Sequence, residues 1–408
     1  MVKKMLNPVI MATVVMIIYI IMPIMSVFVS TYLSTYAYML MCVALFSFIM
    51  LAGGMSRFTS MIYLIFPVGV YVFCTFFVKN ESVVILGYQG LLLLLTVAAG
   101  YYFTYYRDDA VPLFAKVIVF ALVITVITTI IGLLRFPEAS RILATIATSD
   151  DPRMLEYSWN NIGGYEFVYN CVLLYPVLML AYKHRKISRA AFLILFILMF
   201  SLVILAEYTI ALLLTIISST LYFASKKTTT NQLMMIGIIL IFLFLLFQSV
   251  IQNFFLWLSD TLGSEVFAER LTALAGGVEG IENSESNRVE LYRMSIRAFL
   301  ASPVFGNMSG KHIVPGGHSF ILDTLADYGI IGGLAITVMY RNVYRFFFAP
   351  FKNKPGYGFV LWTFIQTVFL SIVNTGAWLH ISALSAPIIL SLIYKTYNED
   401  RYETSLDY

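Results

Sequence analysis

Long apolar runs, separated by short polar stretches, account for most of this chain. An α-helix needs about 20 apolar residues to cross a bilayer, and twelve runs come close to that length. The pattern therefore predicts about a dozen membrane-spanning helices. The runs lie near residues 7–28, 36–52, 60–78, 83–103, 113–134, 165–182, 190–206, 208–224, 233–254, 318–340, 357–375 and 379–394.

Composition leads to the same class of protein. Apolar and aromatic residues make up 60% of the 408 residues, only 12% are charged, and the mean hydropathy is +0.86. A water-soluble chain with these values would have too few charged side chains to cover its surface. We therefore predict an all-α polytopic membrane protein. The net charge of +4 is small, which argues against a nucleic-acid partner.

The apolar run from Ala190 to Ser225 is too long for one span and only just long enough for two. Basic residues flank it on both sides, so the positive-inside rule places both of its ends in the cytoplasm. The run must then cross the membrane outward and return. We place its turn near Glu207, because a carboxylate in the middle of a span is costly. The flanking basic residues are Lys183, Arg185, Lys186, Arg189, Lys226 and Lys227.

The same rule predicts cytoplasmic N- and C-termini and two long outer loops. One outer loop covers residues 135–164 and lies within an N-terminal part, 1–250, that contains about nine spans. A large extracytoplasmic loop follows over 251–317. Residues 318–408 then hold about three spans and a short cytoplasmic tail. The start of the chain is similar to a signal peptide, but its apolar run is too long, so we expect a retained first span.

The large loop contains a predicted amphipathic helix from Asn287 to Ala301, in which apolar residues alternate with arginines. Arg293 and Arg297 are four residues apart and share one face, with Arg288 roughly one residue off that stripe. Arginines so placed can hold a phosphate by bidentate hydrogen bonds. The alternative is a face that rests on anionic lipid.

His318 lies where the large loop re-enters the membrane, at the start of a helix. Its imidazole can exchange a proton near neutral pH, although a histidine here could also cap the helix or contact headgroups. Asp323 and Asp327 follow on one face of that helix, and pairing with a loop arginine is their expected role. We predict no metal site, because no Asp-x-Asp pair is present and the arginines compete for the carboxylates. Motifs for nucleotide binding are also missing.

The segment from Asn287 to Gly333 resembles the O-antigen polymerase and O-antigen ligase family of bacterial membrane enzymes. The family pattern is His-(Asn/Ser), nine residues, then Gly-x-x-Gly, and it is met by His318, Ser319, Gly329 and Gly332. An upstream Asn-Arg-x-Glu and a Pro-x-x-Gly are also similar to the family's loop, at Asn287, Arg288, Glu290, Pro303 and Gly306. The chain departs from the family where it has Ser319 in place of Asn and Asp327 in place of Glu.

This resemblance implies a fold similar to membrane glycosyltransferases of class C, and a metal-independent transfer without a cofactor. The expected reaction joins undecaprenyl-diphosphate-linked repeat units into an O-antigen, capsule or exopolysaccharide on the outer face of the bacterial plasma membrane. Arg288, with Arg293 or Arg153, would hold the diphosphate, and His318 would orient or deprotonate the acceptor hydroxyl. Membrane lipids, a flippase and a chain-length regulator are the further expected partners.

The remaining site residues carry supporting roles in this hypothesis. Arg153 precedes Gly164 with the Arg-x10-Gly spacing of the family's polymerases, and its alternative is a solvated loop residue. The predicted substrate-binding residues are Arg153, Arg293, Arg297, Glu290, Ser319, Asp323, Asp327 and Glu207. The glycines with an expected structural role in the motif are Gly306, Gly329 and Gly332.

Two other functions stay open. A ligase that transfers the finished glycan to a lipid or protein acceptor would share the same residues. A flippase or transporter of lipid-linked sugars belongs to another class, in which charges usually lie inside broken spans related by repeats. Here the charges gather in the outer loops, which favours the enzyme.

Overall fold

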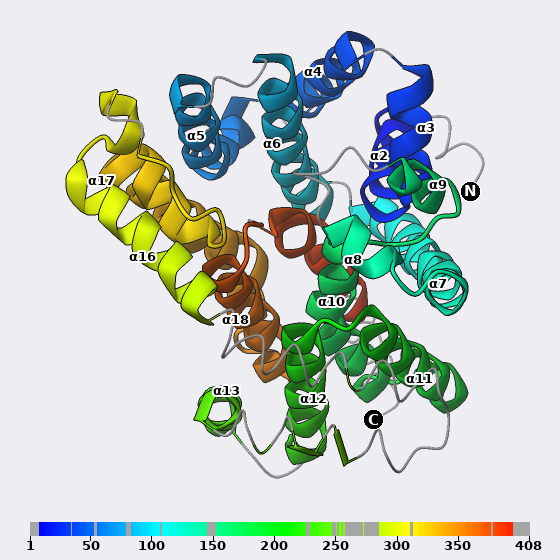
Figure 1. Ribbon diagram of the computed structural model, residues 1–408. Coiled ribbons are helices and arrows are strands. Elements are labelled where there is room, and N and C mark those ends of the chain that lie inside the picture. Colours follow the sequence, from blue (N-terminus) through cyan, green and yellow to red (C-terminus); the bar gives the residue numbers. More distant parts are fainter. Residues whose placement is uncertain are drawn as a thin grey trace.

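The computed structural model describes residues 8–33, 35–52, 55–78, 83–106, 108–144, 152–225, 229–246, 250, 253–254, 256–257, 272, 285–310, 313–376 and 378–394. These residues form helices and short connections, and none of them is in a strand, so the predicted all-α class is confirmed for this part of the chain. Figure 1 shows the arrangement of the helices.

The α-helices in chain order are α2 (Pro8–Ile21), α3 (Pro23–Tyr32), α4 (Thr35–Ala52), α5 (Met55–Val78), α6 (Val83–Tyr105), α7 (Val111–Arg135), α8 (Ala139–Ala144), α9 (Arg153–Trp159), α10 (Tyr165–Lys183), α11 (Arg189–Ala206), α12 (Thr209–Ala224), α13 (Thr230–Leu246), α16 (Glu285–Ala301), α17 (Phe320–Val343) and α18 (Tyr357–Val373). Short 3-10 or π-helical turns are η1 (Asp108–Ala110), η2 (Gly306–Ser309), η3 (Tyr344–Phe348), η4 (Ala349–Phe351) and η5 (Ile381–Ser385). The π-helical η5 is the first turn of the C-terminal helix, Ile381–Tyr394.

Among the described residues, four helices are long and apolar enough to cross a membrane. They are α7, α10, α11 and the continuous stretch Phe320–Phe351 that begins with α17. The bent pair formed by α2 and α3 would make a fifth span. Shorter apolar helices of 10–17 residues account for most of the other predicted runs, including α12, α18 and the C-terminal helix.

Two helices occupy the run over 7–28 that the sequence predicts as one span. The axes of α2 and α3 meet at 110°, and the break falls at Met22, which has an extended backbone (φ −106°, ψ 111°). Pro23 follows it as the first residue of α3. A proline disfavours the helical conformation of the residue before it, which accounts for a break at this position.

The predicted span over 318–340 is interrupted as well. Gly329 lies inside α17 with φ 62° and ψ −152°, a conformation that only glycine adopts without strain. The break divides α17 into a short first part that ends at Tyr328 and a longer second part from Ile330 to Val343. The first part carries the motif residues next to His318.

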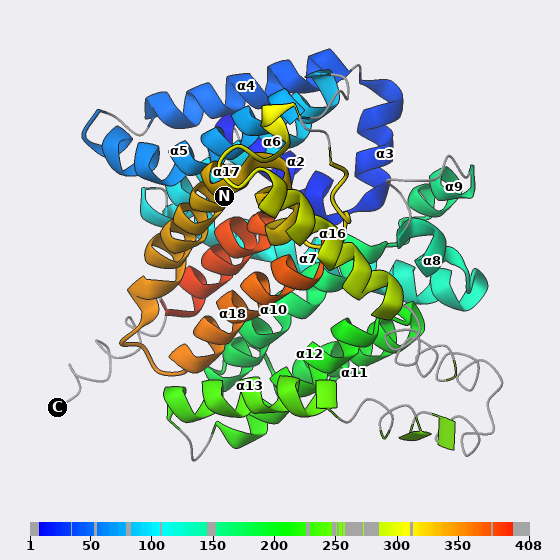
Figure 2. The ribbon, with the colours of Figure 1, turned by 60° about the vertical axis from the view of Figure 1, so that its left-hand side comes forward.

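Helix α10 lies at the centre of the molecule, with α11, α12, α18 and the C-terminal helix around it (Figures 1 and 2). Within its most apolar window, 78% of the residues are buried inside the protein, whereas the corresponding value for α11 is 33%. Helix α10 is therefore an interior helix. Helix α11, in contrast, has a wide outward face.

Hydrogen bonds between distant segments define the two ends of the helix bundle. At one end, the Pro355 carbonyl oxygen lies 3.2 Å from Nε2 of His184 and accepts a hydrogen bond from the Tyr394 hydroxyl at 2.8 Å. Lys183, Arg185, Lys186, Arg189, Lys352 and Lys354 lie in or beside these connections, so we call this the basic end. At the opposite end, the Tyr208 hydroxyl donates to the Ser140 carbonyl oxygen at 2.7 Å.

The turn between α11 and α12 lies at this opposite end and falls where the sequence predicts it. Helix α11 ends at Ala206 and α12 begins at Thr209. Glu207 between them has a left-handed backbone with φ 61°. The long apolar run therefore forms two antiparallel helices, and the Glu207 carboxylate belongs to a turn, not to the middle of a helix.

Candidate functional site

The connection that carries His318 is fixed by the carboxylate of Asp323. The Ser295 hydroxyl donates to Asp323 Oδ1 at 2.6 Å, and the backbone amides of Gly317 and Ser319 donate to its two oxygens at 3.2 and 2.9 Å. Among the described residues these groups are the hydrogen-bond partners of Asp323, and its pairing with a loop arginine stays a prediction. His318 lies between the two bonded amides and is exposed.

Ser319 begins the helix that follows. Its side-chain oxygen accepts a hydrogen bond from the Leu322 amide at 3.1 Å, which makes it the N-cap of α17. Ser319 is fully buried. Its predicted substrate contact remains a prediction, whereas its capping bond gives a structural reason for a short polar residue directly after His318.

Helix α16 lies beside the first part of α17, and the His318 connection presses against it (Figure 1). The Gly316 amide donates to the Ser295 hydroxyl oxygen at 2.9 Å. A Cβ atom on Gly316 would overlap the carbonyl group of Leu291. Ser295 therefore joins α16, the loop and α17, and no periodicity in the sequence marks it for this role.

The two motif glycines Gly306 and Gly329 allow the turn after α16 to pack backbone to backbone on α17. Gly306 has φ 55°, and a Cβ there would lie 2.5 Å from the Ala326 carbonyl oxygen. A Cβ on Gly329 would overlap the carbonyl group of Val304. The break at Gly329 also lets the Ile330 amide donate to the Pro303 carbonyl oxygen at 2.8 Å. A Cβ on the third motif glycine, Gly332, would meet Tyr328 of the preceding turn.

Asp327 is buried beneath this turn and is held by a residue that the sequence analysis did not single out. The Asn307 side-chain amide donates to Asp327 Oδ1 at 2.9 Å and to the Ile313 carbonyl oxygen at 2.8 Å. Its oxygen accepts from the Ile313 amide at 2.9 Å. Asp327 is 9% exposed. The only sequence signal for Asn307 is its place directly after Gly306.

The arginines of α16 do not all face the same way. Ser295 and Ala298 are 1% and 2% exposed and face α17. Arg293 and Arg297 are each two residues from Ser295, about 200° around the helix. Their side chains are 63% and 69% exposed and share one carboxylate, that of Glu290, at N–O distances of 3.6 and 2.9 Å.

Arg288 occupies another position on the helix. It lies seven residues before Ser295, which is nearly two full turns of an α-helix. Its backbone is therefore on the side of α16 that packs against α17. Of the three predicted arginines, Arg288 is therefore the one whose position on α16 lies on the side of the His318 loop.

The connection between α7 and α10 contributes Arg153, the first residue of α9. One turn later, the Tyr157 hydroxyl donates to Glu138 Oε1 at 2.7 Å. Burial, followed by the hydrogen bond and negative charge of Glu138, raises the pKa of Tyr157 to about 12, and the positive charge of Arg153 opposes this rise. Arg153 is exposed, so its guanidinium is accessible from this end.

Asn161 anchors the connection between Arg153 and Gly164. Its side-chain amide donates to the hydroxyls of Thr125 and Thr128 at 3.2 and 3.0 Å. Its oxygen accepts a hydrogen bond from the Ile24 amide, at the start of α3, at 3.3 Å. Asn161 has φ 54° and is 5% exposed. It thus links the Arg153 loop to α7 and to the break between α2 and α3.

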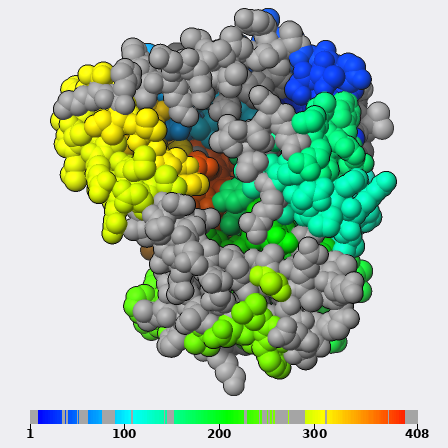
Figure 3. All heavy atoms as spheres, in the orientation of Figure 1, coloured from blue at the N-terminus to red at the C-terminus, as the bar shows by residue number. Residues whose placement is uncertain are grey.

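Figure 3 shows a hollow in the face that Figure 1 also presents. Helices α16 and α17, in yellow, form one side, and the cyan and green segments from α7 to α9 form the other. Green and red-orange segments from the centre and the C-terminal part of the chain lie deeper between them. The His318 loop precedes α17, and Arg153 begins α9, so the elements next to these two residues lie on opposite sides of the hollow.

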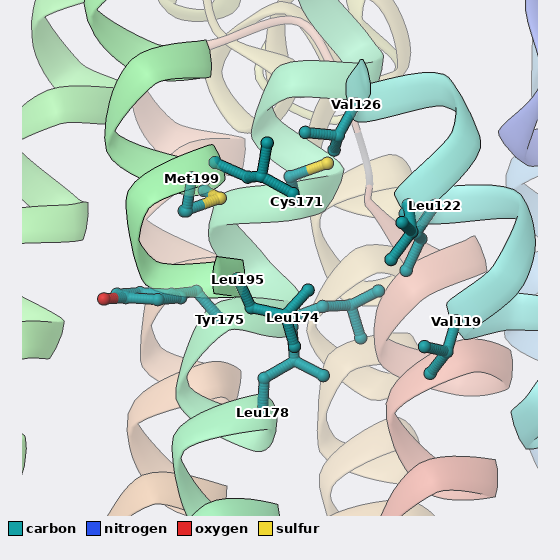
Figure 4. Close-up of a pocket in the computed structure, with 11 residues that line it drawn as sticks. Val119, Leu122, Val126, Cys171, Leu174, Tyr175, Leu178, Leu195 and Met199 are labelled. Carbon is teal, nitrogen blue, oxygen red and sulfur yellow. The ribbon is translucent and has the colours of Figure 1, made fainter. Parts of the chain in front are cut away.

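A separate apolar pocket lies between α7, α10 and α11 (Figure 4). Its lining includes Val119, Leu122, Val126, Cys171, Leu174 and Met199. The hydroxyl of Tyr175, the most polar group in the lining, lies 3.2 Å from the Ser219 hydroxyl. The pocket suits a hydrocarbon chain, and it does not contain the groups that proton transfer requires.

The chain was compared with known protein families, with curated proteins and with solved structures, and none of them matches it. The function must therefore be argued from the chain itself. The motif residues Gly306, Ser319, Asp323, Asp327 and Gly329 belong to one contact unit, whereas Glu290, Arg293 and Arg297 lie on the other side of α16. Arg153 and Glu207 belong to two further connections at this end of the bundle.

Proposed function

We propose that the protein is a membrane glycosyltransferase that joins undecaprenyl-diphosphate-linked oligosaccharides into a surface polysaccharide. The observation that carries this proposal is the contact unit around Asp323 and Gly329. Gly306, Ser319 and Gly329, which resemble the polymerase and ligase family, lie up to 23 positions apart and meet in this unit, next to the exposed His318. A structural role alone does not require an exposed histidine at this point.

The proposed topology has twelve spans, with the basic end in the cytoplasm of a bacterium. This choice puts the loops of His318 and Arg153 on the outer face of the plasma membrane. Lipid-linked repeat units are available on that face and ATP is not, so the diphosphate linkage itself must supply the driving force. The active site is then extracytoplasmic, and both termini are cytoplasmic.

In the proposed reaction, an acceptor hydroxyl oxygen attacks the anomeric carbon of the donor glycan. The bond from that carbon to the diphosphate oxygen breaks, and undecaprenyl diphosphate leaves with the electron pair. His318 accepts the hydroxyl proton. Arg288 holds the diphosphate and stabilises the charge that grows on it, because a guanidinium binds phosphate oxygens in a bidentate manner.

Asp323 and Asp327 act through the backbone in this proposal. Asp323 positions the two amides that flank His318, and Asp327 with Asn307 holds the turn at Gly306. Arg153 approaches the substrate from the other side of the hollow. Arg293, Arg297 and Glu290 form an exposed group that faces away from α17, a location suited to lipid headgroups.

The test is a reconstituted reaction. Purified protein receives lipid-diphosphate-linked repeat units without nucleotide, and the products are separated by length. A ladder from the wild type that His318→Ala and Arg288→Ala both lose would support the proposal. Addition of glycan only to a separate lipid or protein acceptor would identify a ligase instead.

A transporter of lipid-linked sugars is the second candidate, and one observation favours it. The helices α2 and α3 form a bent pair, and the Ile24 amide in the first turn of α3 donates to Asn161, whose amide donates to two threonines of α7. Broken helices with polar groups at the break are common in transporters. Movement of lipid-linked sugar across proteoliposomes, without any longer glycan, would support this candidate and refute the polymerase.

A further inference from the structure

A second cluster of polar side chains lies near the start of α10, apart from the His318 loop. The His380 Nε2 and Asn170 Oδ1 atoms are 3.1 Å apart. When Nε2 of His380 carries the proton and donates a hydrogen bond to Asn170 Oδ1, the other ring nitrogen, Nδ1, is an acceptor. Residues 378–379 and 381–390 are buried, and His380 between them is partly exposed.

Glu166 belongs to the same face of α10 as Asn170. The two residues are four positions apart, so their side chains lie one above the other along the helix. Glu166 is exposed and Asn170 is 4% exposed. A carboxylate, an amide and an imidazole thus line one strip between α10 and the start of the C-terminal helix.

Aromatic residues border this strip. The Trp378 ring packs against Tyr165 and Tyr169 of α10, with centroid distances of 6.5 and 5.6 Å. Tyr165 and Tyr169 lie beside Glu166 in the first turns of α10. The chain therefore crosses α10 between Trp378, which contacts Tyr165 and Tyr169, and His380, which contacts Asn170.

Two buried hydrogen-bond donors next to the strip have no partner among the described residues. They are Nδ2 of Asn374 and Nε1 of Trp378, and the two residues are 5% and 2% exposed. Buried donors of this kind are normally paired, because an unpaired one has lost its hydrogen bonds to water without replacement. Both belong to the connection whose Asn374 carbonyl accepts from the Phe320 amide, at the start of α17, at 2.8 Å.

The donor and acceptor set fits a sugar. A sugar hydroxyl donates one hydrogen bond and accepts others, so a carboxylate, an amide, an imidazole and indole or amide donors together can satisfy several adjacent hydroxyls. Tyrosine and tryptophan present apolar ring faces beside polar edges, which suits the mixed surface of a pyranose. The strip carries a single carboxylate and no guanidinium or ammonium group among these residues, which does not suit a diphosphate.

We propose that Glu166, Asn170 and His380, together with the donors of Asn374 and Trp378, form a binding site for the hydroxyl groups of the acceptor sugar. The assignment of this sugar as the acceptor rests on the proposed function. A sugar bound here would lie next to the segment that contacts the start of α17. The donor diphosphate is then bound separately, on the side of α16 and His318.

The test measures binding and does not depend on turnover. Full-length protein in detergent is titrated with the repeat-unit oligosaccharide released from its carrier by mild acid, and separately with undecaprenyl diphosphate that carries no sugar. The variants are Glu166→Gln and His380→Gln, which keep the size of the side chain and, for His380, a donor toward Asn170. Glu156→Gln on α9 and His184→Gln at the basic end are the matched controls.

We expect both site variants to weaken oligosaccharide binding at least about tenfold, because a site built for hydroxyl groups loses its specific partners. Their affinity for undecaprenyl diphosphate should stay within about twofold of the wild-type value, and the controls should match the wild type with both ligands. Unchanged oligosaccharide binding in the site variants, equal loss with both ligands, or no oligosaccharide binding by the wild type would each overturn the site.

The same samples separate this inference from the proposed function. A wild-type protein that binds the oligosaccharide through these residues but makes no longer glycan refutes the polymerase and leaves the sugar site in place. A protein that polymerises while Glu166→Gln and His380→Gln bind the oligosaccharide normally refutes the sugar site alone.

Discussion

Gly306 and Gly329 make the same kind of contact from opposite sides of one interface. Gly306 lies against the carbonyl groups of Ala326 and Asp327, and Gly329 lies against the carbonyl group of Val304. Both have positive φ values, 55° and 62°. The turn after α16 and the break in α17 therefore fit each other only when neither residue has a Cβ atom.

Gly306→Ala and Gly329→Ala should each destabilise the protein and abolish its activity. Backbone strain alone costs about 1–3 kcal/mol, and the steric overlap adds to it. Thermal unfolding of the purified variants measures the first effect. Gly69→Ala in α5 is the control, because a Cβ there meets no atom within 4 Å and alanine favours a helix. Equal stability of Gly69→Ala and Gly329→Ala would contradict the packing described above.

Asp323→Asn should loosen the loop of His318. The amide keeps one acceptor oxygen in place of the two that receive hydrogen bonds from Ser295, Gly317 and Ser319, so we expect a loss of about 1–3 kcal/mol in the free energy of unfolding. Activity should fall further than stability, since the loop positions His318. Ser30→Ala is the control, because that hydroxyl bonds only within its own helix. Retention of full activity by Asp323→Asn would exclude this positioning role.

Arg288→Ala and Arg297→Ala should have unequal effects on polymerisation. We expect the Arg288 variant to lose at least about a hundredfold in rate, because it removes the phosphate-binding guanidinium. The Arg297 side chain faces away from α17 and shares Glu290 with Arg293, so its removal should change the rate by less than about threefold. Initial rates at saturating substrate provide the comparison. A loss in Arg297→Ala as large as that in Arg288→Ala would place the diphosphate on the outer face of α16.

Asn161→Ala should destabilise the contact between α3, α7 and the Arg153 loop. It removes hydrogen bonds to Ile24, Thr125 and Thr128, and buried groups left without partners cost about 1–3 kcal/mol. Asn161→Gly separates the effect of the left-handed backbone, because glycine keeps that conformation at no strain. The exposed Asn160→Ala is the control in the same thermal unfolding experiment. Similar melting temperatures for the alanine variants at 160 and 161 would contradict an anchoring role.

Stability should decrease in mildly acidic solution through His184. Burial lowers the pKa of His184, and the hydrogen bond with the Pro355 carbonyl raises it by a smaller amount. The folded protein therefore favours the neutral ring. The stabilisation is present above the unfolded pKa of about 6.5 and is lost as pH falls through the lowered folded value. The drop in melting temperature from pH about 7 to about 5 should be smaller in His184→Gln than in the wild type. An identical drop in both proteins would rule out this histidine as a cause.

Much of the helical layout follows from hydrophobic patterning. The divided run at Glu207 and the end of α16 at Ala301 are where the sequence places them, because both depend on local signals: a costly carboxylate inside a long run, and an amphipathic period that stops before Pro303. The breaks at Met22 and Gly329 were missed. In both places the apolar pattern continues across the break, and hydropathy carries no information about backbone angles.

Only part of the candidate site could be predicted from the sequence. The motif glycines and His318 could be found from the family pattern, but the partners of Asp323 come from Ser295, 28 residues earlier, and from backbone amides. Helical spacing correctly groups Arg293 with Arg297, yet it does not say which face of α16 meets α17. His380 and Asn170 are 210 residues apart, so only the folded chain brings them together.

In the proposed membrane location, the central position of α10 also has a consequence for how the chain enters the bilayer. Most of this helix is enclosed by protein, and its Asn170 bonds to a residue near the end of the chain. During synthesis α10 leaves the ribosome long before α18 and His380 exist, so its polar face must be sheltered by lipid headgroups, water or an insertion chaperone until then. Helix α18 and the C-terminal helix complete the enclosure of α10. A chain that stops before them leaves the middle of the bundle exposed to the bilayer.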